Sequence, residues 1–134
     1  MNLELLYITI YSYILGSIPF GLILTKIFLK RDIREVGSGN IGATNVLRTG
    51  KKTLGISTLV LDSLKAYFAV TITLNFFPEY IYLSALLCFL GHIFPIWLKF
   101  NGGKGIAAYL GILFAYSVNL GFIFLITWSI ILFF

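Results

Sequence analysis

The sequence predicts an all-α protein, a polytopic integral membrane bundle with cytoplasmic glycine-rich loops. Three observations support this fold class. Charged residues make up only 11% of the 134 residues, whereas about 25% is usual in soluble domains. Mean hydropathy is +0.97, and apolar runs long enough to cross a bilayer follow one another. Seven of the ten basic residues lie between positions 26 and 52. This composition excludes a soluble or disordered chain, and the single cysteine excludes a disulfide framework.

The first predicted span covers residues 5–29, since a spanning helix needs about 20 mostly apolar residues. Its one charge, Lys26, lies near the end, where a long side chain can reach the membrane interface. Pro19 interrupts the helical pattern, and a proline inside a helix usually kinks the axis. We therefore expect a broken first span whose break lies against protein rather than lipid.

Residues 53–77 form the second predicted span, residues 80–98 the third, and residues 106–134 a final apolar stretch. As one helix the final stretch would be ~43 Å long, more than the ~30 Å core of a bilayer requires. The pattern leaves open one tilted helix or two shorter helices that meet near Ser117. We also expect residues 1–134 to be one membrane domain that lacks a C-terminal part, because the chain ends on apolar residues without a polar anchor.

The basic residues predict the orientation of the bundle. Lys and Arg accumulate in loops on the cytoplasmic side of a membrane, so the loop of residues 30–52 is expected to be cytoplasmic. The N-terminus and the short loop at Pro78 then lie outside, and the loop of residues 99–105 returns to the cytoplasm. Both glycine-rich loops therefore meet on one side. We set nucleic acid aside as a partner, because the basic residues are not interleaved with aromatic ones.

The first loop predicts an anion site on a short helix. Ser38 or Asn40 is expected to cap a helix that runs towards Arg48. On such a helix Asn40, Thr44 and Arg48 are four residues apart and share one face. An amide, a hydroxyl and a guanidinium beside free backbone N–H groups are suited to binding phosphate. The alternative is a flexible interfacial linker with a basic anchor.

The second loop places a lysine among glycines. Lys104 is bracketed by Gly102, Gly103 and Gly105, and glycine lets the backbone approach an anion closely. His92, at the end of the preceding span, is a candidate proton carrier or phosphate donor. The alternative is a tight turn with one interfacial lysine, together with a histidine whose hydrogen bonds are satisfied at a helix end.

Asp62 and Lys65 lie inside the second predicted span, where ionisable groups are costly and mark candidate functional sites. Their spacing of three residues lets them pair with each other on a helix. A purely structural ion pair is the alternative. Asp62 is ~13 Å into its helix, so its carboxyl group needs a pairing group or a water-filled cavity.

Four familiar motifs are rejected. Gly37, Gly39 and Gly42 match G-x-G-x-x-G, but that pattern binds dinucleotides only between a strand and a helix. No Ser or Thr follows Lys104, as a Walker A loop requires. The sequence shows no Ser-His-Asp arrangement, and Trp97 stands where a His-x4-Asp motif would have its aspartate.

Several motifs in order resemble the PlsY family, bacterial membrane acyltransferases that transfer an acyl chain from acyl phosphate to glycerol 3-phosphate and form lysophosphatidic acid. The matching segments are Gly16-Ser17-Ile18-Pro19-Phe20-Gly21, Gly37 to Arg48, Leu61-Asp62-x-x-Lys65, Gly91-His92-x-Phe94-Pro95 and Phe100-x-Gly102-Gly103-Lys104-Gly105. The family's third motif, a cytoplasmic His/Asn/Arg-containing segment, does not occur before Phe134. By resemblance, the chain is expected to be C-terminally truncated, to lack part of its active site and to show little or no acyl transfer.

The resemblance implies a role for each candidate residue. The residues expected to be catalytic are His92, Ser38, Asn40 and Lys104, and those expected to bind substrate are Thr44, Asn45, Arg48, Gly102, Gly103 and Gly105. Asp62 and Lys65 are expected to support the loops from below. The implied partners are acyl phosphate, glycerol 3-phosphate and membrane lipid, with no cofactor and no metal, in a monomer of the bacterial inner membrane. A transporter or channel fragment, with a broken helix around a bound solute, remains the rival interpretation.

Overall fold

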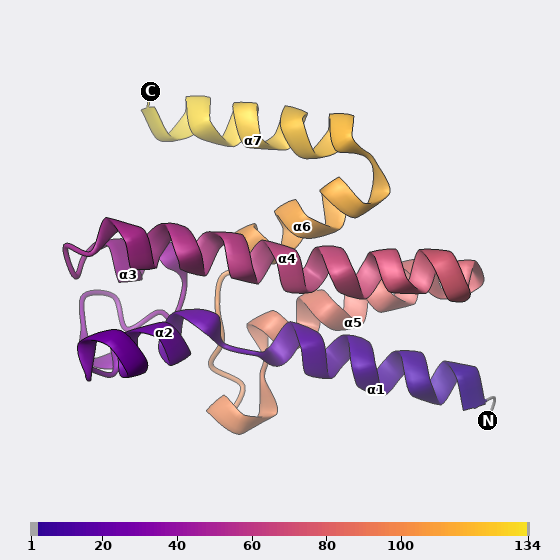
Figure 1. The fold of residues 1–134 in the computed structure, drawn as a ribbon, viewed down its shortest axis with the longest axis horizontal. Helices are drawn as coiled ribbons and strands as arrows, with labels where there is room; N and C mark the ends of the chain where they lie inside the picture. Colours follow the sequence, from indigo (N-terminus) through magenta and orange to yellow (C-terminus); the bar gives the residue numbers. More distant parts are fainter. Residues whose placement is uncertain (1–2, 134) are drawn as a thin grey trace.

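The computed structural model describes residues 3–133, and over that range it contains α-helices and short 3-10 helices but no strand (Figure 1). The α-helices are α1 (Leu3–Ser17), α2 (Phe20–Leu29), α3 (Ala43–Leu47), α4 (Lys52–Phe76), α5 (Ile81–Ile93), α6 (Ile106–Tyr116) and α7 (Val118–Phe133). The 3-10 helices are Ile33–Glu35, Pro78–Tyr80 and Ile96–Leu98. Three segments are long and apolar enough to cross a bilayer: Leu3–Leu29, Lys52–Phe76 and Pro78–Leu98. The prediction of an all-α, multi-pass membrane protein is confirmed.

The long helices pack side by side with alternating direction. α1 packs chiefly against α5, and α4 against α6. The start of α1 and the turn between α4 and α5 lie at one end of the bundle, whereas the loop that contains α3 lies at the opposite end (Figure 1). α6 and α7 form a hairpin, and α7 runs back over α4 and α6 in this view.

The first span is broken where the sequence predicts. α1 ends at Ser17 and α2 begins at Phe20, because Pro19 has no N–H to continue the helix. Two carbonyls at the break are bonded from other elements. Trp97 Nε1 donates to the Ser17 carbonyl at 2.8 Å, and Lys65 Nζ donates to the Ile18 carbonyl at 2.5 Å. The expectation that the break lies against protein is therefore confirmed.

The structure differs from one predicted span and decides between the two alternatives left open for another. The helix predicted over residues 80–98 ends as α5 at Ile93, and the chain continues as a 3-10 turn after Pro95, because proline disfavours a helical residue before it. The final stretch is two helices rather than one, since Ser117 adopts an extended conformation with φ −163° and ψ 130°. α6 has 11 residues, ~16 Å at the standard rise, and is too short to cross a bilayer alone.

Small residues allow the helices to approach closely. A Cβ at Gly16 would meet the backbone of Cys88 on α5, and one at Gly111 would meet the carbonyl of Ser63 on α4. The core between α4, α5 and α6 is made of the buried side chains of Ala66, Ala69, Val70, Ala85, Cys88, Ala108 and Ile112. Close crossings of small residues are typical of helix pairs in membranes, where van der Waals packing replaces the hydrophobic effect.

Candidate functional site

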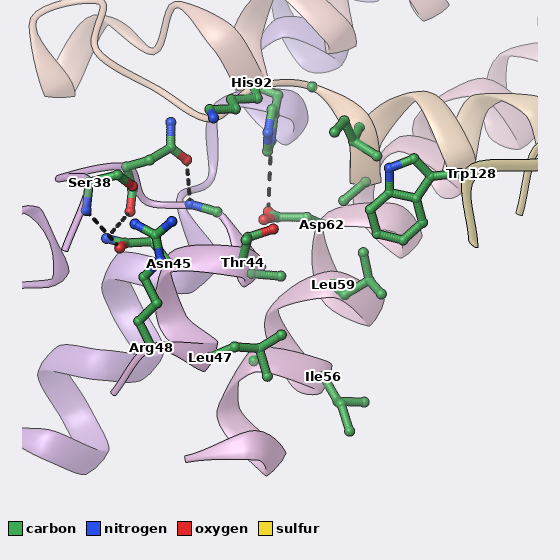
Figure 2. Close-up of a pocket in the computed structure, with 18 residues that line it drawn as sticks. Ser38, Thr44, Asn45, Leu47, Arg48, Ile56, Leu59, Asp62, His92 and Trp128 are labelled. Atoms are coloured by element: carbon green, nitrogen blue, oxygen red, sulfur yellow. Dashed lines mark hydrogen bonds and ion pairs between the residues drawn. The ribbon is translucent and has the colours of Figure 1, made fainter. Parts of the chain in front are cut away.

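A cavity of about 250 Å³ lies where the two glycine-rich loops meet α4 and α7. It is lined by Ser38, Asn40, Gly42, Ala43, Thr44, Asn45, Leu47, Arg48, Gly55, Ile56, Leu59, Asp62, His92, Lys104, Gly105, Ile106, Ala107 and Trp128. Figure 2 shows the polar side chains Ser38, Asn45 and Arg48 on one side, and Leu59, Ile56 and Trp128 on the other. The cavity therefore has a polar part and an apolar part.

The first wall of the cavity, residues 33–48, is held in shape by Asn45. Its side chain is buried, with 2% of the residue exposed. Nδ2 donates to the carbonyls of Ile33 at 3.1 Å, Val36 at 2.8 Å and Asn40 at 2.8 Å. Oδ1 accepts from the N–H of Ser38 at 3.1 Å (Figure 2). Both ends of the amide are thus occupied by the backbone, so Asn45 orders the loop rather than facing the cavity with free hydrogen-bonding groups.

The short helix predicted in this loop begins later than expected. α3 starts at Ala43 with Gly42 as its N-cap, and no side chain caps it. Asn40 instead forms an Asx turn, in which Oδ1 accepts from the N–H of Gly42 at 2.8 Å. The prediction that Ser38 or Asn40 caps the helix is wrong, because the Asn40 side chain is used by the turn that precedes it. Asn40, Thr44 and Arg48 nevertheless line the same cavity.

Two cations reach the cavity without an acidic partner among residues 3–133. Arg48, from the first loop, and Lys104, from the second, are both exposed, and neither forms a salt bridge in the part of the chain that the structure describes. Asp32, an acid of the same loop as Arg48, is occupied by another cation, since Arg34 bonds both of its oxygens at 2.9 and 2.7 Å. This contact holds the pKa of Asp32 well below its usual range. The cavity is therefore left with uncompensated positive charge.

The second wall, residues 92–105, is held by close backbone packing. The N–H of Gly102 donates to the carbonyl of Ile93 at 2.9 Å, and the N–H of Gly103 donates to the carbonyl of His92 at 3.0 Å. A Cβ at Gly103 would collide with the imidazole of His92, and one at Gly105 would meet the ring of Phe89. Glycine here allows the loop to fold against His92.

The buried charges on α4 form the floor of the cavity. Asp62 and Lys65 are paired, with Nζ and Oδ1 2.7 Å apart and both side chains almost completely buried. Asp62 lines the cavity, whereas Lys65 lies behind it and reaches the break of the first span. His92 Nδ1 is 3.8 Å from the same oxygen of Asp62 (Figure 2).

The structure brings together most of the residues that the sequence singled out. Nine of them line one cavity: Ser38, Asn40, Thr44, Asn45, Arg48, Asp62, His92, Lys104 and Gly105. Lys65, Gly102 and Gly103 do not line it, and the N–H groups of the two glycines are used within the loop. Residues 3–133 contain no cluster of three or more His, Cys, Asp or Glu side chains able to hold a metal ion.

Sequence reasoning missed the apolar part of the cavity. Trp128 comes from α7, 24 positions after Lys104, and α7 is apolar on all sides. A helix without an amphipathic pattern gives no signal for the face that turns inward. For Ile56 and Leu59 the sequence pattern predicts only that they belong to the second span. The signal available in the sequence was the position of Asp62 on the same helix, since residues 59 and 62 are neighbours on its surface.

Comparisons with known proteins agree with the sequence motifs. A family model described as Glycerol-3-phosphate acyltransferase matches residues 6–134. The chain is 59% identical over 128 residues to a glycerol-3-phosphate acyltransferase of Pelagibacter ubique, an alignment that covers 96% of this chain and 67% of the relative. It is 54% identical over 132 residues to the one of Wolbachia pipientis wMel, covering 96% of this chain and 68% of the relative.

Solved structures resemble the fold as well. The crystal structure of PlsY, an integral membrane glycerol 3-phosphate acyltransferase, in its glycerol 3-phosphate form matches with a TM-score of 0.87 and 39% identity, covering 96% of this chain and 66% of that one. The lysophosphatidic acid form of PlsY matches with a TM-score of 0.80 and 38% identity. The chain therefore spans about two thirds of the length of these relatives.

Proposed function

The chain belongs to the glycerol-3-phosphate acyltransferase family, and we propose that its cavity transfers an acyl group from acyl phosphate to glycerol 3-phosphate, forming lysophosphatidic acid for phospholipid synthesis. One observation carries this proposal. Two cations from separate loops, Arg48 and Lys104, face one cavity without acidic partners in the described residues, and that cavity continues into an apolar part. The two substrates together carry two phosphate groups, which match the two cations, and one acyl chain, which matches the apolar part.

The reaction needs positioning more than a covalent nucleophile. Acyl phosphate is a mixed anhydride, so a hydroxyl of glycerol 3-phosphate attacks its carbonyl carbon directly. The new ester C–O bond forms, the C–O bond to phosphate breaks, and phosphate leaves with the electron pair. The hydroxyl proton passes to the leaving phosphate, either directly or through His92. Charge neutralisation by preorganised donors and correct placement of the hydroxyl account for catalysis of this kind.

The residues of the polar part divide between the two phosphates. Arg48 binds the phosphate of glycerol 3-phosphate, because a guanidinium presents a planar fork of donors to phosphate oxygens. Thr44 and Ser38 bind the glycerol hydroxyls, and Asn45 and Asn40 keep these groups in place through the loop backbone. Lys104, on the opposite wall, binds the phosphate of the acyl donor, with Gly105 beside it.

The acyl chain of the donor lies along the apolar side of α4. Leu59 lines the cavity, and Ser63 and Tyr67, four and eight positions further along the same face, line a second cavity of about 300 Å³ against α6. The twelve residues from Ile56 to Tyr67 span ~17 Å, about half of the ~30 Å bilayer core. One leaflet of the membrane has this depth, so the two cavities along α4 together match an acyl chain that enters from the bilayer.

The protein is proposed to lie in the bacterial inner membrane as a monomer, with the N-terminus outside and both loops in the cytoplasm. Cysteines at positions 34 and 52, placed one at a time in a Cys88→Ala background, should react with an impermeant thiol reagent from the cytoplasmic side. A cysteine at position 79 should react from the opposite side. Reaction of positions 52 and 79 from the same side would overturn this orientation.

A transporter is less consistent with the broken span. In transporters the carbonyls freed at such a break coordinate the solute or coupling ion. Here the carbonyls of Ser17 and Ile18 are already bonded to Trp97 and Lys65.

The experiment that tests the proposed function supplies acyl phosphate and radiolabelled glycerol 3-phosphate to lipid vesicles that contain the protein. In line with the expectation of little acyl transfer, we expect labelled lysophosphatidic acid to form in the lipid fraction slowly, but above the level of vesicles without protein. Label that accumulates unmodified inside the vesicles would favour transport instead.

A further inference from the structure

The ion pair of Asp62 and Lys65 connects the break of the first span with the floor of the cavity. Lys65 Nζ donates both to the Ile18 carbonyl, at 2.5 Å, and to Asp62 Oδ1, at 2.7 Å. Its ammonium therefore fixes the carboxylate relative to the broken helix. Replacing a buried ion pair by apolar residues often costs nothing in stability, so packing alone does not explain why two charges lie here.

His92 lies on the other side of the same carboxylate. Its Nδ1 is buried and has no hydrogen-bond partner, and it lies 3.8 Å from Asp62 Oδ1. A buried polar atom without a partner is unusual and calls for an explanation. The distance is too long for a hydrogen bond, so the carboxylate acts on this nitrogen through its charge.

The opposite edge of the imidazole faces the second loop. The ring atoms Nε2 and Cε1 occupy the space that a Cβ of Gly103 would take. Gly103 is followed directly by Lys104, which lines the cavity. The ring is thus held between a carboxylate at Nδ1 and the glycine-rich loop at Nε2.

We propose that Asp62 is a positioning residue for His92, selecting the tautomer in which Nδ1 carries the proton and Nε2 keeps its lone pair. A negative charge near Nδ1 in a medium of low dielectric constant favours the proton on that nitrogen. Lys65 Nζ, 2.7 Å from Oδ1, holds the carboxylate in place. The selection of the tautomer stands on this geometry alone, whereas its effect on acyl transfer rests on the proposed function. In the proposed acyl transfer, Nε2 accepts the proton of the attacking hydroxyl of glycerol 3-phosphate and then donates it to the leaving phosphate.

Nitrogen NMR tests the tautomer directly, because His92 is the only histidine in the chain. The chain is labelled with 15N-histidine, carries an affinity tag without histidine, and is reconstituted in lipid. We expect Nδ1 to show the chemical shift of a protonated ring nitrogen and Nε2 that of an unprotonated one. The reverse assignment in the unsubstituted protein would overturn the proposal, whatever the behaviour of any variant.

A double variant separates positioning from structure. Asp62→Leu combined with Lys65→Met removes both charges, and we expect a mixture of tautomers and a kcat lowered on the order of 10²-fold with little change in the KM for glycerol 3-phosphate. The control Tyr13→Phe removes the hydrogen bond from Tyr13 to the carbonyl of Phe94, in the same segment as His92, and should leave the spectrum unchanged. An unchanged spectrum in the double variant would contradict the role of Asp62. If the proposed function were wrong, the spectra would follow these expectations while the unsubstituted protein formed no lysophosphatidic acid.

Discussion

The two walls of the cavity are built in different ways. The wall of residues 33–48 is held by side-chain hydrogen bonds, in which one buried amide, that of Asn45, serves backbone groups of four other residues. The wall of residues 92–105 is held by close packing. Gly103 and Gly105 have no side chains, so the loop packs directly against the rings of His92 and Phe89. Each wall contributes one cation to the cavity, Arg48 from the first and Lys104 from the second.

The difference determines which substitutions each wall tolerates. A wall held by hydrogen bonds is destabilised when a donor or acceptor is removed, because its buried partners are then left without a hydrogen bond. A wall held by close packing fails when volume is added, because the backbone and ring have no room to move apart. The first wall should therefore be sensitive to polarity, and the second to size.

Asn45→Ala should give the largest effect. The change leaves the carbonyls of Ile33, Val36 and Asn40 without their shared donor. Loss of a buried partner costs roughly 1 to 3 kcal/mol per group, so we expect at least about 3 kcal/mol of destabilisation, and loss of activity as the loop disorders. Thermal unfolding in detergent, followed by circular dichroism and by activity, measures both.

The matched control for this change is Asn75→Ala. The Asn75 amide also donates to a backbone carbonyl, that of Thr71, but at an exposed position of α4. Its loss should cost less than about 0.5 kcal/mol. Equal destabilisation by the two variants would show that Asn45 does not hold the first wall.

Gly103→Ala should come next, with activity reduced on the order of 10²-fold. The added methyl group collides with the imidazole of His92, and a displacement of about 1 Å at a reacting group costs about that factor. Strain in the packed loop should add roughly 1 to 3 kcal/mol of destabilisation. Initial rates with acyl phosphate and glycerol 3-phosphate, together with unfolding curves, measure the two effects.

Gly50→Ala distinguishes the collision from an effect of alanine on the backbone. Gly50 has φ +81°, so alanine is strained there, yet its Cβ would meet nothing within 4 Å. We expect a modest loss of stability with activity close to that of the unsubstituted protein. If Gly50→Ala and Gly103→Ala reduced activity equally, close packing against His92 would not be what holds the second wall.

Apolar periodicity and motif spacing predicted the framework of the molecule. The break at Pro19 and the pairing of Asp62 with Lys65 followed from backbone chemistry and from helical spacing, and both are local properties. The first-loop helix was placed too early, because the pattern did not show that the Asn40 side chain would bond the N–H of Gly42. Local rules thus predicted the elements but not how neighbouring turns compete for the same groups.

The remaining parts of the site depend on contacts between distant residues. The sequence marks Asn45 as a candidate for binding substrate without showing that its amide bonds carbonyls up to 12 positions away. At Gly103 it predicts a close approach without showing that the ring of His92 lies against this glycine. A sequence shows that a position is small or polar without showing what lies against it.

Arg48→Lys tests the charge that the first wall presents rather than the wall itself. An ammonium keeps the charge but loses the planar fork of donors, and a charge-assisted contact contributes roughly 1.5 to 3 kcal/mol. We expect the KM for glycerol 3-phosphate to rise about tenfold or more, with unchanged thermal stability. The exposed Arg31, outside the cavity, provides the control Arg31→Lys. A normal KM in the Arg48 variant would remove this side chain from the site.

The smallest effect is expected from Trp128→Ala, because Trp128 belongs to neither wall. Trp128 faces the polar side of the cavity from α7 (Figure 2), so in the proposed arrangement it contacts the acyl chain rather than either phosphate. Losing part of its apolar contact area should cost about 1 kcal/mol, or about fivefold in the KM for a long-chain acyl phosphate. The KM for glycerol 3-phosphate should not change, and short-chain donors should be affected less than long-chain ones. Ile131→Ala, at a position of α7 that is 76% exposed, is the control for substitutions that only face lipid. If Trp128→Ala raised the KM equally for donors of every chain length, the apolar part of the cavity would not be the place where the acyl chain binds.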